Sequence, residues 1–239
     1  MYLNSMKVAI MQPYLFPYIG YYQLINAVDK FIIYDDVNFI KQGWINRNVI
    51  IVNGKPYKYA VPLENQSSFS KINEILINQK IYQIWKKKFL KTIEQNYNKA
   101  PFFKEVFPII KSIFDIETTN ISDLAINSLK NISNYIRITT VFEESSAIYQ
   151  NQNLSSQNRV LDICKKEKAK VYINPIGGLG LYSENFFLEE KITLKFIKSH
   201  TINYNQFNQE FVPNLSIIDV LMFNEVDTIK EFLTNYELI

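Results

Sequence analysis

Residues 6–48 read MKVAIMQPYLFPYIGYYQLINAVDKFIIYDDVNFIKQGWINRN, and this stretch decides the fold. A short apolar run over residues 8–11 predicts a buried strand, and a loop rich in Pro and Tyr follows it. Residues 21–28 have the length of a helix, and residues 31–34 form a second apolar run. Strand, loop, helix and strand in this order make a βαβ unit, which predicts a parallel sheet.

The chain after this stretch interrupts the alternation with a hairpin and helices. Two apolar runs over residues 49–61 flank Asn53-Gly54, a dipeptide typical of tight hairpin turns. Three segments with helical spacing of apolar residues follow, over residues 82–97, 102–114 (interrupted at Pro108) and 120–135. These segments predict a helical middle region.

Strands and helices alternate again towards the C-terminus. Strand-like runs cover residues 138–142, 171–173 and 192–197, and helical patterns cover residues 158–168, 217–223 and 227–233. The sequence therefore predicts one α/β domain over residues 1–239. It combines a Rossmann-like parallel sheet, a helical insertion around residues 80–135 and a small hairpin.

Composition excludes several kinds of site and partner. Hydrophobic residues make up 47% of the 239, enough for a sizeable core. The net charge of +3 is too small to favour a nucleic-acid partner. A single Cys and a single His exclude a disulfide, a cysteine metal cluster and a multi-histidine site, so no metal site is expected. No apolar run approaches the ~20 residues of a membrane span, and no signal segment is evident, so we expect a cytoplasmic protein.

The loop after the first predicted strand holds one candidate site. Ligands of parallel sheets bind outside the carboxyl ends of the strands, where this loop places Gln12, Tyr14, Tyr18, Gly20 and Tyr21. Nucleotidyltransferases and pantoate-type ligases have a His-x-Gly-His motif here, in which the glycine and the helix N-terminus hold phosphate. Tyr18 and Tyr21 replace both histidines, and they donate hydrogen bonds without positive charge. The alternative is a core aromatic cluster beside a turn glycine.

Two adjacent carboxylates, Asp35 and Asp36, follow the second predicted strand. Side chains alternate along a strand, so we expect one acid to face the crevice at the end of the sheet and the other to face away. The crevice acid can act as a general base, a Mg²⁺ ligand or a partner for a ligand amine. The alternative is a loop carboxylate that caps a turn or pairs with Lys41 or Arg47.

Residues 44–48 read Trp-Ile-Asn-Arg-Asn and suit a sugar or a nucleotide. Trp44 offers a ring for stacking, Asn46 offers an amide for hydroxyl groups, and Arg47 can bind phosphate with two hydrogen bonds. The alternative is a Trp that anchors the hairpin beside a solvated Arg47. The two interpretations are compatible.

Two further segments carry candidate residues. Asn174 precedes the pair Gly177-Gly178, whose backbone N–H groups can face an anion, although paired glycines more often form only a turn. His200 follows another predicted strand and is a candidate general acid or base, without a Ser–His–acid spacing around it. Cys164 lies on an apolar helix face and is expected in the core.

Four segments resemble the WbqC-like protein family: MQPYLFPYIGYYQLI (residues 11–25), DKFIIYDDVNFIKQGWINRN (29–48), NRVLDICKKEKAKVYINPIGGLGLY (158–182) and FVPNLSIIDVLMFNE (211–225). The third departs from the family pattern at Asn158 and Val160. The resemblance implies a setting in bacterial O-antigen, lipopolysaccharide and other surface-polysaccharide biosynthesis, where amino sugars are modified. It implies no common reaction. The last segment looks structural, and its residues 213–216 can bring a loop towards the site.

Three hypotheses follow. The first is a transferase that acylates or aminoacylates a nucleotide-linked amino sugar, a small-molecule substrate, with Asp36 or Asp35 acting on the amine. The second is a nucleotidyltransferase or adenylate-forming ligase around the Tyr18–Tyr21 loop, with ATP and Mg²⁺ as cofactors. The third is a non-enzymatic partner in a glycan-assembly complex, with an interface formed by the abundant Tyr and Phe. A homo-oligomer is compatible with each.

Overall fold

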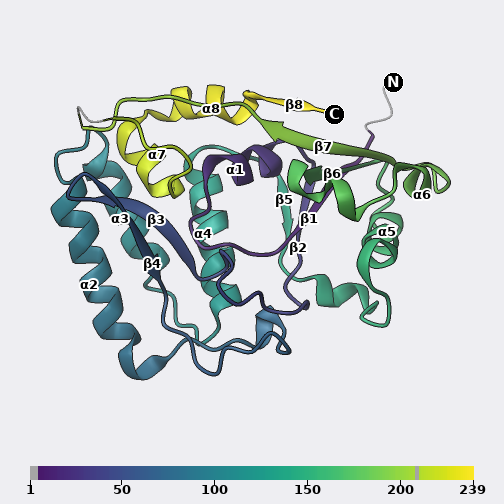
Figure 1. Cartoon of the computed structure of the whole chain (residues 1–239), viewed down its shortest axis with the longest axis horizontal. Coiled ribbons are helices and arrows are strands. Elements are labelled where there is room, and N and C mark those ends of the chain that lie inside the picture. Colours follow the sequence, from purple (N-terminus) through teal and green to yellow (C-terminus); the bar gives the residue numbers. More distant parts are fainter. Residues whose placement is uncertain (1–4, 208–209) are drawn as a thin grey trace.

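A six-stranded sheet lies at the centre of the computed structural model, which describes residues 5–207 and 210–239 (Figure 1). In spatial order its strands are β5 (Val141–Glu143), β2 (Lys30–Ile33), β1 (Lys7–Met11), β6 (Val171–Pro175), β7 (Thr193–Ser199) and β8 (Tyr236–Leu238). The first five run parallel to their neighbours, whereas β8 is antiparallel to β7. The prediction of a parallel sheet is confirmed.

The order of the parallel strands is that of a doubly wound fold. Helix α1 (Ile19–Asn26) links β1 to β2, as the opening stretch predicted. Counted along the chain, the five parallel strands lie in the order 3-2-1-4-5, with β1 at the centre. The chain extends the sheet from β1 towards β2 and later resumes at β6 on the other side of β1. Ligands of such folds bind near this switch point, at the carboxyl ends of the strands.

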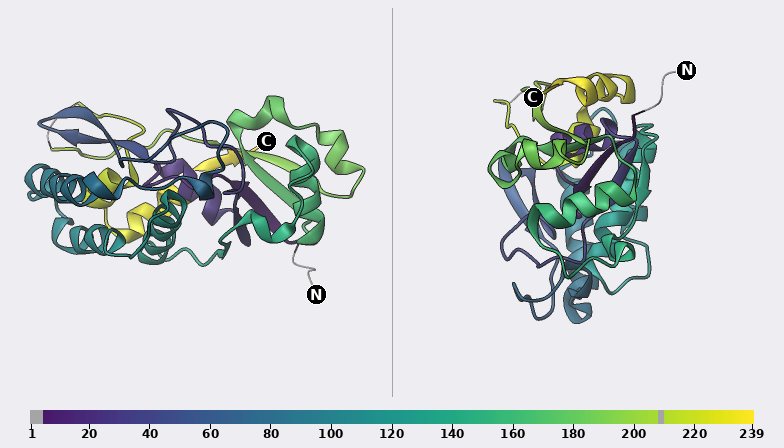
Figure 2. Two further views of the ribbon diagram at one scale, coloured as in Figure 1. Left: turned by 90° about the horizontal axis from the view of Figure 1, so that it is seen from below. Right: turned by 90° about the vertical axis from the view of Figure 1, so that its right-hand side faces the viewer.

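Side chains of β1 alternate between two hydrophobic cores, one on each face of the sheet. Ala9 joins the core that contains α1 and the C-terminal helices α7 (Ile217–Phe223) and α8 (Val226–Thr234). Val8 and Ile10 join the second core, with α5 (Ser156–Lys166) and α6 (Glu184–Leu188), which are green in Figure 2. Cys164 is buried in this second core, as predicted.

The hairpin and the helical middle region follow β2 in the chain. Strands β3 (Arg47–Val52) and β4 (Lys55–Ala60) form a separate antiparallel sheet, and Asn53 and Gly54 both have the positive φ that a type I′ turn requires. Helices α2 (Gln79–Tyr97), α3 (Phe103–Ile113) and α4 (Ile121–Tyr135) come next. Their apolar faces share the first core with α1 and the hairpin, which supports our proposal of one domain.

The secondary structure predicted from local sequence patterns was wrong or incomplete at three places. Helix α3 continues through Pro108, because Val106, Ile110 and Ile113 bury its opposite face in the core. The edge strand begins at Val141, three residues later than predicted. Residues 236–238 form β8, whose pairing with β7 is non-local and leaves no periodic signal. Among the helices described, none has both the length and the apolar character to cross a membrane.

Candidate functional site

Two adjoining pockets lie beside α1. The first, which we call the aromatic pocket, has a volume of about 320 Å³ and is lined by Tyr14, Pro17, Tyr18, Trp44, Asn48 and Asn214. Four of these six residues present a ring to the cavity wall. The sequence-predicted residues Tyr14 and Tyr18, from the loop before α1, are thus brought together with Trp44, from the loop before β3.

The second cavity, the α1 pocket, has a volume of about 330 Å³. The start of α1, the end of β7 and two later loop segments line it, and its polar or aromatic side chains include Tyr18, Ser199, His200, Tyr204, Phe211 and Asn214. Tyr18 and Asn214 line both pockets, so the two cavities adjoin at these side chains, and we treat them together as one candidate site. Among the described residues that line either pocket, none is Lys or Arg.

Gly20 is required by close packing in the first turn of α1. A Cβ atom at this position would lie 2.3 Å from a ring carbon of Tyr18 and 2.8 Å from the Ser199 hydroxyl. The absence of a side chain lets the Tyr18 ring lie over the helix and lets β7 approach it. Gly20 therefore shapes the α1 pocket at its floor, beside the partly positive N-terminus of the helix.

His200 is held from both its backbone and its ring. Its N–H donates to the Asn235 carbonyl at 3.1 Å, and its ring Nδ1 lies 3.2 Å from Asn235 Oδ1. An amide oxygen only accepts, so the contact fits the neutral tautomer that carries its proton on Nδ1 and has a lone pair on Nε2. His200 is exposed and lines the α1 pocket, so its ring can accept a proton from a ligand there.

Tyr21 and Gln12 lie apart from both pockets. The buried Tyr21 hydroxyl donates to the Gln12 carbonyl at 2.6 Å, and burial raises the pKa of Tyr21 well above its ordinary value. The Tyr21 ring packs against Tyr14, with 5.5 Å between ring centroids. Tyr21 thus supports the wall of the aromatic pocket from behind.

Two asparagines after Trp44 form hydrogen bonds that join the start of the hairpin to its end and to the loop between β1 and α1. Asn46 donates to the Val61 carbonyl at 2.8 Å, and Asn48 donates to the Phe16 carbonyl at 2.7 Å. Trp44 is half-exposed, and the Lys58 ammonium lies 5.5 Å from its ring centroid. Arg47 Nε is buried without a hydrogen-bond partner in the described part of the chain. Anchoring hydrogen bonds from Asn46 and Asn48 and a pocket-lining ring on Trp44 therefore coexist in this short block.

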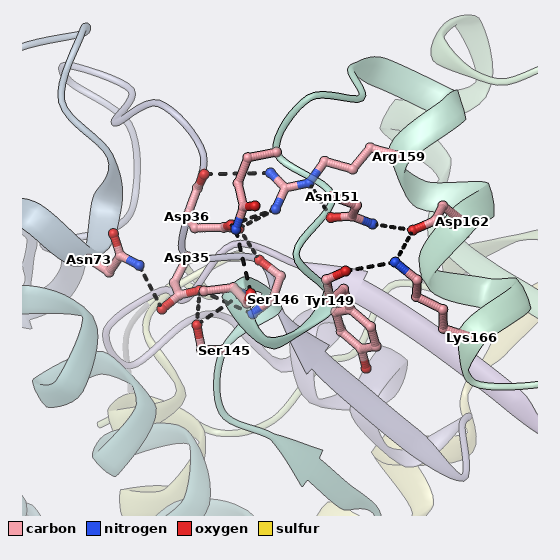
Figure 3. A network of polar contacts seen from close by, with 12 residues as sticks. Asp35, Asp36, Asn73, Ser145, Ser146, Tyr149, Asn151, Arg159, Asp162 and Lys166 are labelled. Atoms are coloured by element: carbon pink, nitrogen blue, oxygen red, sulfur yellow. Dashed lines mark hydrogen bonds and ion pairs between the residues drawn. The ribbon is translucent and has the colours of Figure 1, made fainter.

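Asp36, in the loop after β2, belongs to a buried network of hydrogen bonds that includes an ion pair (Figure 3). Its side chain is 2% exposed, and both of its oxygens accept from Arg159 Nη2, at 2.6 and 2.5 Å. Ser146 and Gln152 donate to the same carboxylate. Burial alone raises the pKa of Asp36, but the hydrogen bonds from Ser146, Arg159 and Gln152 outweigh it and lower that pKa.

Asp35 is held by neighbouring donors. It accepts from the Ser145 hydroxyl at 2.8 Å, the Ser146 N–H at 3.2 Å and Asn73 at 3.4 Å. Burial raises its pKa. Neither Asp35 nor Asp36 lines the aromatic pocket or the α1 pocket. The pair fastens the loop after β2 to the segment before α5, and Arg159, which the sequence reading missed, completes it.

The turn after β6 also packs closely. Asn174 is buried and accepts from the Tyr172 hydroxyl at 3.1 Å. A Cβ atom on Gly178 would lie 1.8 Å from Asn174 Nδ2, so this glycine makes room for the amide. Gly177 and Gly178 lie in a 3-10 helix, Ile176–Leu181, and line neither pocket. In the described residues, no group of three His, Cys, Asp or Glu side chains is placed to hold a metal.

Comparisons with known proteins agree with the sequence resemblance. The model of the WbqC-like protein family matches residues 12–231. A protein of Mycobacterium tuberculosis strain H37Rv, named "Uncharacterized protein Rv1507c", is 32% identical over 221 residues, covering 91% of this chain and 93% of its own length. No solved structure matches the chain.

Proposed function

This chain belongs to the WbqC-like protein family, and from that premise we propose that it is an enzyme of bacterial surface-polysaccharide biosynthesis. The proposed reaction transfers an acyl or aminoacyl group to the amine of a nucleotide-linked amino sugar. One observation carries this proposal: the aromatic pocket and the α1 pocket meet at Tyr18 and Asn214, with His200 at the second.

The two pockets suit the two ends of such a substrate. The rings of Tyr14, Tyr18 and Trp44 offer stacking surfaces for a base or a sugar. Lys58 supplies a positive charge beside Trp44, and the N-terminus of α1 adds a partial positive charge for a phosphate at the junction. The second pocket then receives the end of the substrate that carries the amine.

The chemistry needs a base, because a sugar amine is largely protonated at neutral pH. His200 Nε2 takes the ammonium proton, and the neutral nitrogen attacks the carbonyl carbon of an activated acyl ester or thioester. The new C–N bond forms, the bond to the leaving group breaks with its electron pair, and the second proton passes from nitrogen to that group. His200 suits this role better than Asp36, whose lone pairs are engaged by Arg159 and whose pKa is lowered.

Ligand binding and product mass together test the proposal. UDP- and dTDP-linked amino sugars at millimolar concentration should raise the Tm through ligand linkage. With a panel of acyl and aminoacyl donors, mass spectrometry should detect the acylated sugar nucleotide. His200→Ala should keep the Tm shift and lose the product. A broad panel that produces no Tm shift and no product contradicts the proposal.

A nucleotidyltransferase or adenylate-forming ligase is the second candidate. The 3-2-1-4-5 strand order and the opening of the α1 N-terminus onto a pocket favour it. The lack of Lys and Arg among the described lining residues weakens it, because triphosphate binding needs positive charge. Release of pyrophosphate from ATP in the presence of Mg²⁺ and an acceptor sugar would establish this candidate over the first.

A non-enzymatic partner role or a homo-oligomer is supported only by a small exposed apolar surface among the described residues. Most aromatic side chains of the described residues are buried or partly buried, as in an ordinary core. Phe69 is 91% exposed and Ile40 is 51% exposed, and the backbone bond from Phe39 to Ser70 brings their loops together. Light scattering of wild type and Phe69→Ser at equal concentration would reveal an assembly that depends on this surface.

A further inference from the structure

Asp219 is a buried carboxylate behind the α1 pocket. It lies in α7 with no exposed surface. Its Oδ2 accepts from the Tyr97 hydroxyl at 2.8 Å. Its Oδ1 accepts from the Tyr204 hydroxyl and from Gln206 Nε2, both at 2.7 Å. Three donors from two segments of the chain, α2 and the loop of residues 204–206, therefore converge on one side chain.

Backbone groups fix the direction of these hydrogen bonds. The N–H of Ile51 donates to the Tyr97 oxygen at 2.9 Å, so the hydroxyl proton of Tyr97 is left to point at Asp219. The N–H of Val212 donates to Gln206 Oε1 at 2.8 Å, which turns the NH₂ group of Gln206 towards Asp219. Gln206 also donates to the Tyr204 oxygen at 3.1 Å, so the Tyr204 proton likewise points at Asp219.

An acceptor of three directed donors is an ionised carboxylate, since a protonated one would have to donate. Within the part of the chain that the structure describes, no Lys, Arg or His forms an ion pair with Asp219. A buried charge is costly unless it is compensated. Asp219 also lies in the first turn of α7, whose partial positive charge stabilises a carboxylate. Asp219 therefore carries a negative charge that its described neighbours solvate without supplying a full positive charge.

The pocket in front of this charge is lined with aromatic rings. Tyr204, which donates to Asp219, lines the α1 pocket together with Phe211 and Tyr18. The Tyr204 and Phe211 rings meet edge to face, with 5.2 Å between centroids and 80° between planes. Aromatic faces attract cations, and a negative charge behind them adds to that attraction.

We propose that the α1 pocket is a binding site for the ammonium group of a protonated primary amine, with Asp219 as its balancing charge. This inference rests on the proposed acylation of an amino sugar and assigns the amine-bearing end of the substrate to the α1 pocket. The aromatic pocket then receives the base. Asp219 acts on the ligand through Tyr204 and is a specificity-determining residue, while His200 lines the same pocket from β7.

Simple sugars test the site without relying on a nucleotide or on turnover. D-glucosamine and N-acetyl-D-glucosamine are titrated against wild-type protein by calorimetry at about pH 6, where the amine of the first is protonated. We expect glucosamine to bind at least about tenfold more tightly, which corresponds to about 1.4 kcal/mol. Equal affinities, or no binding of glucosamine at tens of millimolar, overturn the inference.

Two variants assign the selectivity to Asp219. Asp219→Asn removes the charge, and Tyr204→Phe keeps the ring while removing the hydroxyl that joins it to Asp219. Asp219→Asn should reduce the preference for glucosamine towards unity. Tyr204→Phe leaves the Asp219 charge in place and removes only the hydroxyl contact, so it should reduce the preference by a smaller amount. This smaller reduction decides the question if Asp219→Asn fails to fold. The control is Asp227→Asn, which removes one exposed carboxylate from α8 and should keep the preference.

The outcomes for the two proposals are distinguishable. Selective binding of glucosamine without acyl transfer from any donor keeps the ammonium site and counts against the proposed reaction. Acyl transfer to an amino sugar by a protein that binds both sugars equally keeps the reaction and overturns the ammonium site. A full preference retained in both Tyr204→Phe and Asp219→Asn also overturns the assignment of Asp219.

Discussion

Asp36 and Asp219 are two buried carboxylates of one chain with opposite surroundings. Asp36 pairs with Arg159, so its charge is neutralised inside the protein. Among the residues that the structure describes, Asp219 accepts from two tyrosines and a glutamine and from no cationic side chain. Burial raises the pKa of Asp219, and the hydrogen bonds from Tyr204, Tyr97 and Gln206 only partly offset this, whereas the pKa of Asp36 is lowered.

Under the proposed ammonium site, this difference separates fold maintenance from ligand recognition. The Asp36 network is complete without any ligand, and it joins the loop after β2 to α5. The Asp219 network contains no positively charged side chain among the described residues, and Tyr204, one of its donors, lines the α1 pocket. A buried acid whose charge is left uncompensated beside a cavity is therefore the better guide to function here.

The largest expected effect comes from removing the counter-ion of Asp36. Arg159→Met leaves a buried, unpaired carboxylate, and it should lower the free energy of unfolding by about 3–5 kcal/mol. Urea unfolding at neutral pH measures the change. The exposed pair of Lys198 and Glu237 provides the control, since Lys198→Met should leave the unfolding midpoint nearly unchanged.

The double variant Asp36→Leu/Arg159→Met sharpens this test. Replacing both charges by apolar groups removes the unpaired carboxylate, so most of the lost stability should return. A single variant Arg159→Met as stable as wild type would show that Asp36 does not depend on its partner, and the contrast with Asp219 would disappear.

The second prediction compares substitutions of His200, the proposed base, and of Asp36, the proposed structural acid. His200→Ala should lower the rate of acyl transfer at least about 100-fold, the range of general-base catalysis, while the Tm stays unchanged. Asp36→Asn should lower the Tm and leave the rate per folded molecule close to wild type, because Asp36 lies outside both pockets. The reverse result would make Asp36 the base, as the sequence first suggested.

Local sequence signals were sufficient for the framework of the fold. The stretch of residues 6–48 predicted β1, α1 and β2, and Asn53-Gly54 predicted the turn between β3 and β4, because each signal arises within a few neighbouring residues. Strand β8 gave no signal, because its hydrogen bonds to β7 join residues about 40 positions apart.

The candidate site was predictable only where the opening stretch of residues 6–48 supplied it. Tyr14, Tyr18 and Trp44 were found from the chemistry of the opening stretch, and the structure places them in one pocket. No local sequence pattern gave a reason to select Tyr204, Phe211 or Asp219. These residues come to lie in or behind the α1 pocket only when the C-terminal segment folds against α1. The adjacent acids Asp35 and Asp36 at a strand end were a strong local signal for a site. Their structural role was not predictable, because Arg159, the ion-pair partner of Asp36, is 123 residues away in the chain.

The third prediction concerns the aromatic pocket. Trp44→Ala should weaken binding of a UDP-linked amino sugar about 2–10-fold, because stacking of aromatic rings contributes about 0.5–1.5 kcal/mol. Calorimetry measures the affinity. Tyr57, on the neighbouring strand β4, is exposed to a similar extent and lines neither pocket, so Tyr57→Ala is the matched control. Equal losses in both variants would remove Trp44 from the site.

The smallest expected effect is the pH dependence of stability, which should have opposite signs for the two acids. The ordinary Asp pKa is 3.8. Because folding lowers the pKa of Asp36, its stabilisation is present above that value and is lost as the pH falls through the folded pKa. Because folding raises the pKa of Asp219, its contribution is present below 3.8 and is lost as the pH rises through the folded pKa.

Urea unfolding between about pH 3 and pH 7 can separate the two signs, since each unit of pKa shift corresponds to about 1.4 kcal/mol. As the pH falls, wild type should lose stability relative to Asp36→Asn and gain stability relative to Asp219→Asn. Protonation of an ammonium-bound Asp219 is disfavoured by the nearby cation, so glucosamine should reduce the second trend and leave the first unchanged. Trends of the same sign would mean that Asp219 is compensated within the protein, and the contrast between the two acids would fail.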